Sequence, residues 1–200
     1  MKSTRVLLMF AALSLGGAAM AQSDAHKMQS DAPKVQTEAQ KSFAALKTLA
    51  GNWEGKIIMD TTAFGKPDDD TMKVSLRVTS RGNALVHEMG DLNPAGDPTK
   101  NDHPVTMFYL DGDKLTLIHY CDAGNRPRMT ARVSEDGKRI EFDFADLSGS
   151  NGHGHMHHAV FTIIDANHHI EEWTYMMPGD KPMHGRAELQ RVTEKQASAR

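Results

Sequence analysis

Alternation of apolar and polar residues dominates the sequence after Gly51. Turn residues recur about every eight to twelve positions, which is typical of an all-β sandwich or barrel. In two segments, MFYLDGDKLTLIHY and TARVSEDGKRIEFDF, an Asp-Gly pair joins two alternating stretches, as expected of β-hairpins. The pattern predicts ten strands, over residues 53–60, 72–79, 84–91, 105–110, 114–121, 128–133, 139–145, 158–164, 168–177 and 184–192.

A helical period precedes this alternating region. Phe43, Leu46 and Leu49 recur at the spacing of one helix face. Thr37 suits the start of a helix, and Gly51 lies just beyond its expected end. The sequence therefore predicts an all-β fold, an antiparallel up-and-down barrel of about ten strands that is preceded by one short N-terminal helix.

The connections between the predicted strands differ in length. Short ones lie at residues 81–83, 111–113, 134–137 and 165–167. Longer ones lie at residues 61–71, 92–104, 122–127, 146–157 and 178–183. Because successive connections of an up-and-down meander alternate between the two ends of the barrel, the longer loops should all share one end. A closed bottom and an elaborated mouth predict a binding site at the mouth.

The N-terminal region predicts export. Lys2 and Arg5 precede an apolar run over residues 6–19, and Ala-Met-Ala at the end of residues 1–21 is a signal-peptide cleavage pattern. Residues 22–36 carry most of a polar repeat, QSDAHKM, QSDAPKV and QTEAQKS, which favours a disordered linker over an oligomerisation helix. The helix and barrel should then form one domain over residues 37–194, with a tail at 195–200. We expect secretion across the inner membrane and a periplasmic location.

Composition, charge and the lack of known motifs argue against several classes of function. The formal net charge is -3 and the 23 Lys and Arg residues are scattered, so nucleic acid is not an expected partner. No second apolar run of roughly 18 residues follows the signal peptide, so no membrane span is expected. Cys121 is the only cysteine, which excludes an internal disulfide. Without a Gly-x-Ser-x-Gly, Walker, His-Glu-x-x-His or dinucleotide motif, the sequence favours a binding protein over an enzyme.

The stretch LAGNWEG, residues 49–55, places a Gly-x-Trp at the entry to the first strand after a short helix. It resembles the calycin signature of lipocalins and fatty-acid-binding proteins, in which a Trp of the first strand is typically covered by an Arg near the end of the last. Trp53 and Arg191 are the matching residues. The sequence also resembles uncharacterised lipocalin-like domains of exported bacterial proteins, in the stretches HYC, GNRPRM and WTY and in its L-x-R ending. The resemblance implies a ligand-binding barrel, here with more strands than typical lipocalins and without the Gly-rich first-strand extension of haem-binding members.

Polar side chains on a predicted inward face suggest where a ligand would bind. On strand 114–121, Leu117, His119 and Cys121 share one face. If that face lines the lumen, His119 and Cys121 lie near the mouth. They could then contact a ligand, bind a metal or form a thiolate site. The structural alternative is a buried thiol beside a core histidine. On strand 168–177 the inward face carries either Trp173 or Glu172. The residues predicted to contact a ligand are His87, Leu117, His119, Cys121, Met129 and Phe142.

The segment SNGHGHMHHAVF, residues 150–161, concentrates histidines at the predicted mouth. Imidazole suits zinc, copper or nickel, but Gly152 and Gly154 indicate a flexible segment that is first of all a rim loop. The residues predicted to hold a metal are His155, His157, His158 and His184.

The favoured function is therefore that of an exported protein that binds a small apolar or amphipathic molecule in the barrel lumen. The alternative is a periplasmic metal- or haem-binding protein that uses His, Met and Cys residues at the mouth. An enzyme that uses His119 with Cys121 is a third hypothesis. The sequence indicates no particular ligand or cofactor.

Overall fold

The computed structural model describes residues 35–60, 69–90 and 103–192. The predicted signal peptide and the C-terminal tail lie outside these residues, as does nearly all of the predicted linker. The described chain consists of α1 (Glu38–Lys47), a 3-10 turn (Ser80–Gly82) and the strands β1 (Gly51–Met59), β2 (Asp69–Thr79), β3 (Ala84–Gly90), β4 (Val105–Asp111), β5 (Lys114–Tyr120), β6 (Asn125–Val133), β7 (Arg139–Gly149), β8 (His155–Asp165), β9 (His168–Met177) and β10 (Lys181–Arg191).

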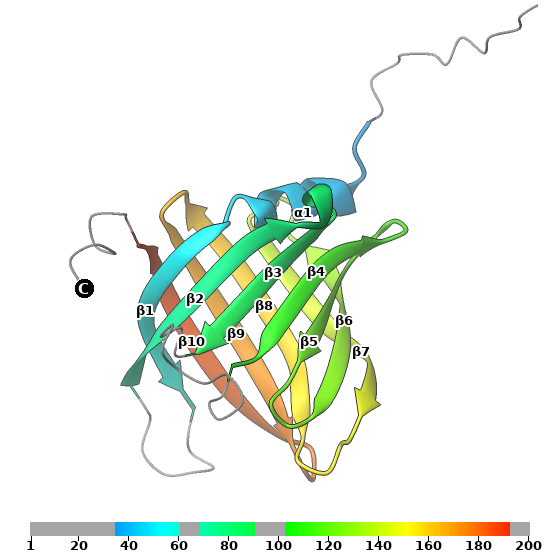
Figure 1. Ribbon diagram of the computed structural model, residues 1–200, viewed down its shortest axis with the longest axis vertical. Helices are drawn as coiled ribbons and strands as arrows, with labels where there is room; N and C mark the ends of the chain where they lie inside the picture. Colours follow the sequence, from blue (N-terminus) through cyan, green and yellow to red (C-terminus); the bar gives the residue numbers. More distant parts are fainter. Residues whose placement is uncertain (1–34, 61–68, 91–102, 193–200) are drawn as a thin grey trace, which may run out of the picture. The chain divides into compact units, whose positions relative to one another are not determined.

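The ten strands form one closed antiparallel barrel with up-and-down topology (Figure 1). Each strand pairs with its neighbours in sequence, and β1 pairs with β10 from Trp53–Arg191 to Met59–Gly185, which closes the ring. The predicted fold class is confirmed. No described helix has the length and apolar character of a membrane span.

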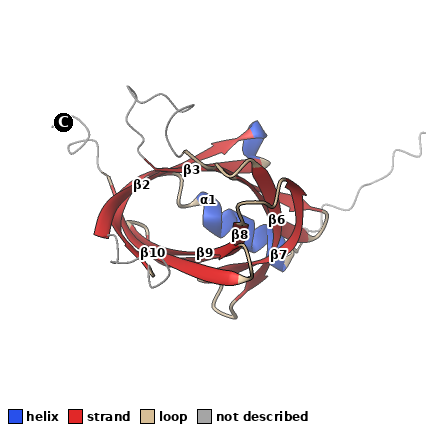
Figure 2. Cartoon of the chain, turned by 90° about the horizontal axis from the view of Figure 1, so that it is seen from below, coloured by secondary structure: helices blue, strands red, loops and turns tan. Residues whose placement is uncertain are grey.

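Helix α1 closes one end of the barrel, as the view along the ring of strands shows (Figure 2). Thr37 caps it, since its hydroxyl accepts the Gln40 backbone N–H and the Gln40 side chain accepts the Thr37 backbone N–H. Phe43, Leu46 and Leu49 are buried and belong to the same apolar core as the strands. The helical period in the sequence therefore marks the face that plugs the barrel.

The Trp53–Arg191 contact implied by the calycin resemblance is present beside α1. The Arg191 guanidinium lies 4.1 Å from the Trp53 ring centroid and donates to the carbonyls of Thr48, Ala50 and Ala166. Glycine suits position 51, because its φ of 142° is rare for other residues and a Cβ there would lie 2.3 Å from the Arg191 nitrogen that bonds to Ala50. The contact ties the helix, the first strand and the last strand together at the closed end.

Large side chains fill the lumen towards α1. Phe108, Phe142 and Phe161 are fully buried, with ring centroids 5.3–6.0 Å apart. Leu117 and Met129 are fully buried in the same core. Tilted and edge-to-face contacts of this kind add to the burial of apolar surface, so this half of the barrel is a packed interior.

Three of the predicted long connections are shorter in the structure, because β6 begins at Asn125, β10 begins at Lys181, and β7 and β8 are both extended. The largest difference is between β7 and β8. These strands reach further toward the mouth than the sequence indicates, so that His155 to His158 lie in β8 and the turn is only residues 150–154. The Asn125 amide donates to the carbonyls of Ser150 and Gly154, and the Tyr175 hydroxyl donates to that of His153. The predicted flexible glycine segment is therefore a hydrogen-bonded turn, with Gly154 at a φ of 92°.

Candidate functional site

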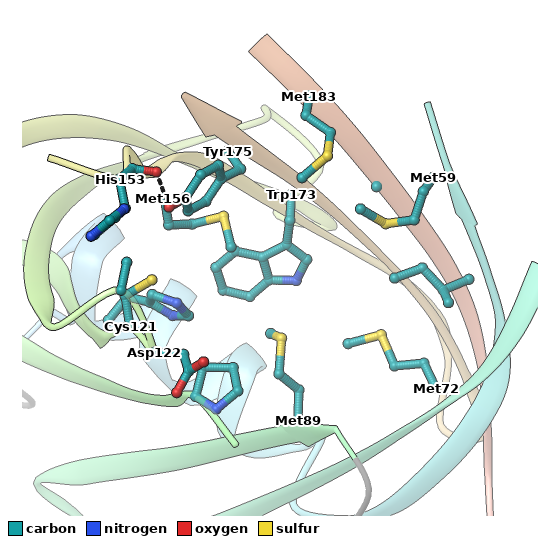
Figure 3. A pocket seen from close by; sticks show the side chains of 15 residues that line it. Met59, Met72, Met89, Cys121, Asp122, His153, Met156, Trp173, Tyr175 and Met183 are labelled. Atoms are coloured by element: carbon teal, nitrogen blue, oxygen red, sulfur yellow. Dashed lines mark hydrogen bonds between the residues drawn. The ribbon is translucent and has the colours of Figure 1, made fainter. Parts of the chain in front are cut away.

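The candidate site is a cavity at the end of the barrel opposite α1, and residues of the β5–β6 and β7–β8 connections line it together with residues of the strands. It has a volume of about 680 Å³ and opens to solvent. Figure 3 shows methionine thioethers placed around the indole of Trp173. The lining residues are Ile57, Met59, Met72, Met89, Pro104, His119, Cys121, Asp122, Ala123, His153, Met156, Trp173, Tyr175, Met183 and Gly185.

His119 is the most deeply buried polar side chain of the cavity wall. It lies near the end of β5, and its Nδ1 is 2.8 Å from the Oγ1 of Thr106, the residue opposite it on β4. Burial, together with the nearby charge of His87, lowers the pKa of His119 from 6.5 to about 3. The imidazole is therefore neutral at physiological pH.

A second polar group lies behind the cavity wall, around the carboxylate of Glu171 on β9. Glu171 is fully buried, as are His87 and His169. The carboxylate oxygens lie 3.0–3.1 Å from Nε2 of His87 and 3.0 Å from Nε2 of His169, and the indole N–H of Trp173 donates over 3.0 Å. Three N–H groups from three side chains thus meet one carboxylate.

The protonation state of Glu171 follows from these partners. Burial by itself would raise the pKa of this carboxyl, but the positive field and hydrogen bonds of His87 and His169 outweigh burial and hold that pKa below its ordinary value. Glu171 is therefore an anion. Its hydrogen bond to Trp173 fixes the indole that forms the centre of the cavity wall.

The residues predicted to contact a ligand separate into two groups. His119 and Cys121 line the cavity. Leu117, Met129 and Phe142 belong to the packed interior toward α1, and His87 bonds to Glu171. Any contact of these residues with a ligand stays a prediction.

The four predicted metal ligands do not converge. His155 and His157 lie together, with Nε2 of the first 3.1 Å from Nδ1 of the second, and both rings pack on Phe144. His158 bonds elsewhere, with Nε2 3.0 Å from a Glu141 oxygen, and His184 bonds to Thr174. A β-bulge between Met156 and His158 interrupts the regular alternation of side chains along this part of β8.

The outer face of β7 and β8 carries a possible metal-binding group, in which ligand atoms of Glu141, Asp143 and His158 lie within 4.8 Å of one another. Arg132 pairs with both carboxylates and Arg139 pairs with that of Glu141. A hydrogen bond from His158 and the Arg139 guanidinium lower the pKa of Glu141. The arginines thus already neutralise the group, which makes it a weaker metal candidate than its geometry alone suggests.

The Glu171 group was not among the predicted sites. From the alternation in HHIEEWTYMM, either face of β9 could be internal. In the structure the internal face carries His169, Glu171 and Trp173, and Glu172 lies on the outer face. Trp173 on that face was the available signal, since a large aromatic side chain favours the interior. The five methionines of the cavity are spread over five strands, so no local motif marks them.

No protein-family model matches the sequence, and the comparison with curated proteins gives no match. Among solved structures, the chain is similar to Rv2717c from M. tuberculosis, with a TM-score of 0.57 and 13% sequence identity, over 76% of this chain and 98% of that one. It is also similar to the S-type phycobiliprotein lyase CPES from Guillardia theta, with a TM-score of 0.51 and 9% identity, over 80% and 99% of the two chains. These similarities show the fold alone, a lipocalin-like β-barrel, which is consistent with ligand binding.

Proposed function

We propose that the protein binds a small, mainly apolar molecule in the cavity at the barrel mouth. The observation that carries this proposal is an open cavity of about 680 Å³, which falls within the size range of small-molecule sites. Its wall combines an apolar majority with a few polar groups, as such sites do. The predicted signal peptide suggests that the protein acts after export.

The rigidity of the wall supports this function. Trp173 is held through Glu171, and Tyr175 is held through the His153 carbonyl. Side chains that are fixed before the ligand arrives lose little conformational entropy on binding. The cavity is therefore already arranged to receive an apolar molecule, whose transfer from water supplies the binding free energy.

Titration with N-phenyl-1-naphthylamine, a neutral fluorescent apolar probe, tests the proposal. We expect saturable binding of one probe per chain. Met89→Glu should weaken it at least about tenfold, because Met89 lines the cavity and a carboxylate there would lose hydration without a partner. Met107→Glu is the matched control, since Met107 lies on the neighbouring strand between two inward residues and so points outward. Absence of saturable binding, or equal weakening by both variants, would contradict the proposal.

A second candidate function is transition-metal binding, and the His155–His157 pair favours it. Two imidazole nitrogens bound to one tetrahedral zinc ion at about 2.0–2.1 Å are separated by about 3.3 Å. The observed separation of 3.1 Å is close to this value. Nδ1 of His155 bonds to Oδ1 of Asn151 over 3.0 Å, which leaves Nε2 as the coordinating atom and fixes the ring.

Calorimetric titration of untagged protein with Zn²⁺ and Cu²⁺ tests the metal candidate. We expect one equivalent to bind, and His155→Gln and His157→Gln each to lower the affinity at least about tenfold, the size of loss that follows removal of an imidazole ligand or its support. His184→Gln is the matched control, because this imidazole bonds to Thr174 and belongs neither to the pair nor to the group of Glu141, Asp143 and His158. Weak, non-stoichiometric binding that all three variants reduce alike would exclude a site at the pair.

A further inference from the structure

The Thr106–His119 hydrogen bond determines which nitrogen of His119 carries its proton. Both side chains are buried, and within the described residues the Thr106 hydroxyl has Nδ1 of His119 as its one hydrogen-bond partner. A buried hydroxyl hydrogen needs an acceptor, and Nδ1 is the acceptor on hand. The hydroxyl therefore donates to Nδ1, and the proton of the neutral imidazole lies on Nε2.

This tautomer gives the cavity an uncharged N–H donor. The His119 ring lines the cavity, packs against Trp173 with ring centroids 5.5 Å apart, and has Nε2 as its remaining polar atom. A ligand atom that meets Nε2–H must be an acceptor. A metal ion would need a lone pair at Nε2, so the same tautomer disfavours His119 as a ligand to metal or haem iron.

The charges around the cavity indicate that the acceptor is neutral. The described lining residues include Asp122 and no Lys or Arg. Among the described lining residues, a ligand carboxylate would meet the Asp122 carboxylate and no Lys or Arg, whereas a carbonyl oxygen would meet the uncharged His119 donor.

The apolar part of the wall favours a flat conjugated ring system. Met59, Met72, Met89, Met156 and Met183 surround the Trp173 indole (Figure 3). Thioether sulfur makes favourable contacts with aromatic rings, and flexible methionine side chains adjust to the outline of a flat molecule. Trp173 is only 7% exposed, and the part of its indole that lines the cavity offers a surface for aromatic packing.

We propose that the ligand of this cavity is a neutral aromatic carbonyl compound, whose rings lie between Trp173 and the methionines and whose oxygen accepts a hydrogen bond from Nε2 of His119. The inference rests on the proposed function, because it assigns a ligand class to the same cavity. It separates this barrel from one that holds a fatty acid through a cationic side chain.

Two probes of equal outline test this inference on the mature protein. Fluorene and 9-fluorenone share one ring skeleton and differ in a CH₂ or C=O group at the central carbon. We expect 9-fluorenone to bind roughly 2- to 13-fold more tightly, the ratio that corresponds to one neutral hydrogen bond. His119→Phe should remove the preference for 9-fluorenone. His184→Phe is the control and should keep that preference, because His184 also bonds to a threonine but is exposed.

A long-range ¹H–¹⁵N NMR spectrum of the unsubstituted protein provides a test that no variant can disturb. The spectrum should assign His119 to the Nε2–H tautomer, and an Nδ1–H tautomer would overturn the inference. Equal affinity for the two probes would overturn it while leaving the proposed function intact. If neither these probes nor N-phenyl-1-naphthylamine binds, both the inference and the proposed function fail.

Discussion

Glu171→Ala is expected to lower the free energy of unfolding by about 3–5 kcal/mol, the cost of removing one partner from a buried charged network. The substitution leaves the N–H groups of His87, His169 and Trp173 without their shared acceptor in a site closed to water. It also leaves a void where the carboxylate was. Urea unfolding at neutral pH, followed by circular dichroism, measures the change.

Two further variants distinguish the effect of losing the carboxylate from the effect of changing the strand. Glu171→Gln keeps the shape and one acceptor oxygen, so its loss should fall between zero and that of Glu171→Ala. Glu172→Ala changes the next residue of the same strand, which lies on the outer face, and should stay within about 0.5 kcal/mol of the unsubstituted protein. A loss for Glu172→Ala as large as that for Glu171→Ala would show that the strand, and not the carboxylate, is responsible.

The fold could be predicted from the sequence because its signals are local and repeated. Alternation along each strand and turns between strands define the meander, and the Gly51, Trp53 and Arg191 signature indicates how it closes. A meander places successive connections at alternate ends, so the mouth could be located, although its connections at residues 121–124, 150–154 and 178–180 are shorter than predicted. Misplaced strand ends, such as the end of β7 and the start of β8 within residues 146–157, did not change this order.

The candidate site could be predicted only in part, because its residues meet across the barrel. His119 and Cys121 were accessible to sequence reasoning since both lie on one strand face. Glu171 receives a partner from β3, 84 positions away, and no local pattern encodes that pairing. His157 bonds to His155 and His158 bonds to Glu141, and the β-bulge at this point breaks the alternation from which such partners could be read in the sequence.

The stability of the protein is expected to fall between pH 7 and pH 5 because of His119. The pKa of this imidazole is about 3 in the folded chain and 6.5 when it is exposed. Between these two values the unfolded chain binds a proton that the folded chain does not, so the free energy of unfolding rises with pH and falls as the pH is lowered through 6.5. One such group contributes about 2 kcal/mol to the difference between pH 7 and pH 5.

His119→Gln isolates this contribution from those of the other histidines. The variant cannot take up the proton in the unfolded chain, so the fall between pH 7 and pH 5 should be smaller by about 2 kcal/mol than in the unsubstituted protein. His184→Gln removes an imidazole that bonds to a threonine at 3.0 Å on the outer face, where water reaches it in the folded chain as well. An equal reduction by both variants would mean that the loss of a histidine, and not its burial beside Thr106, sets the pH dependence.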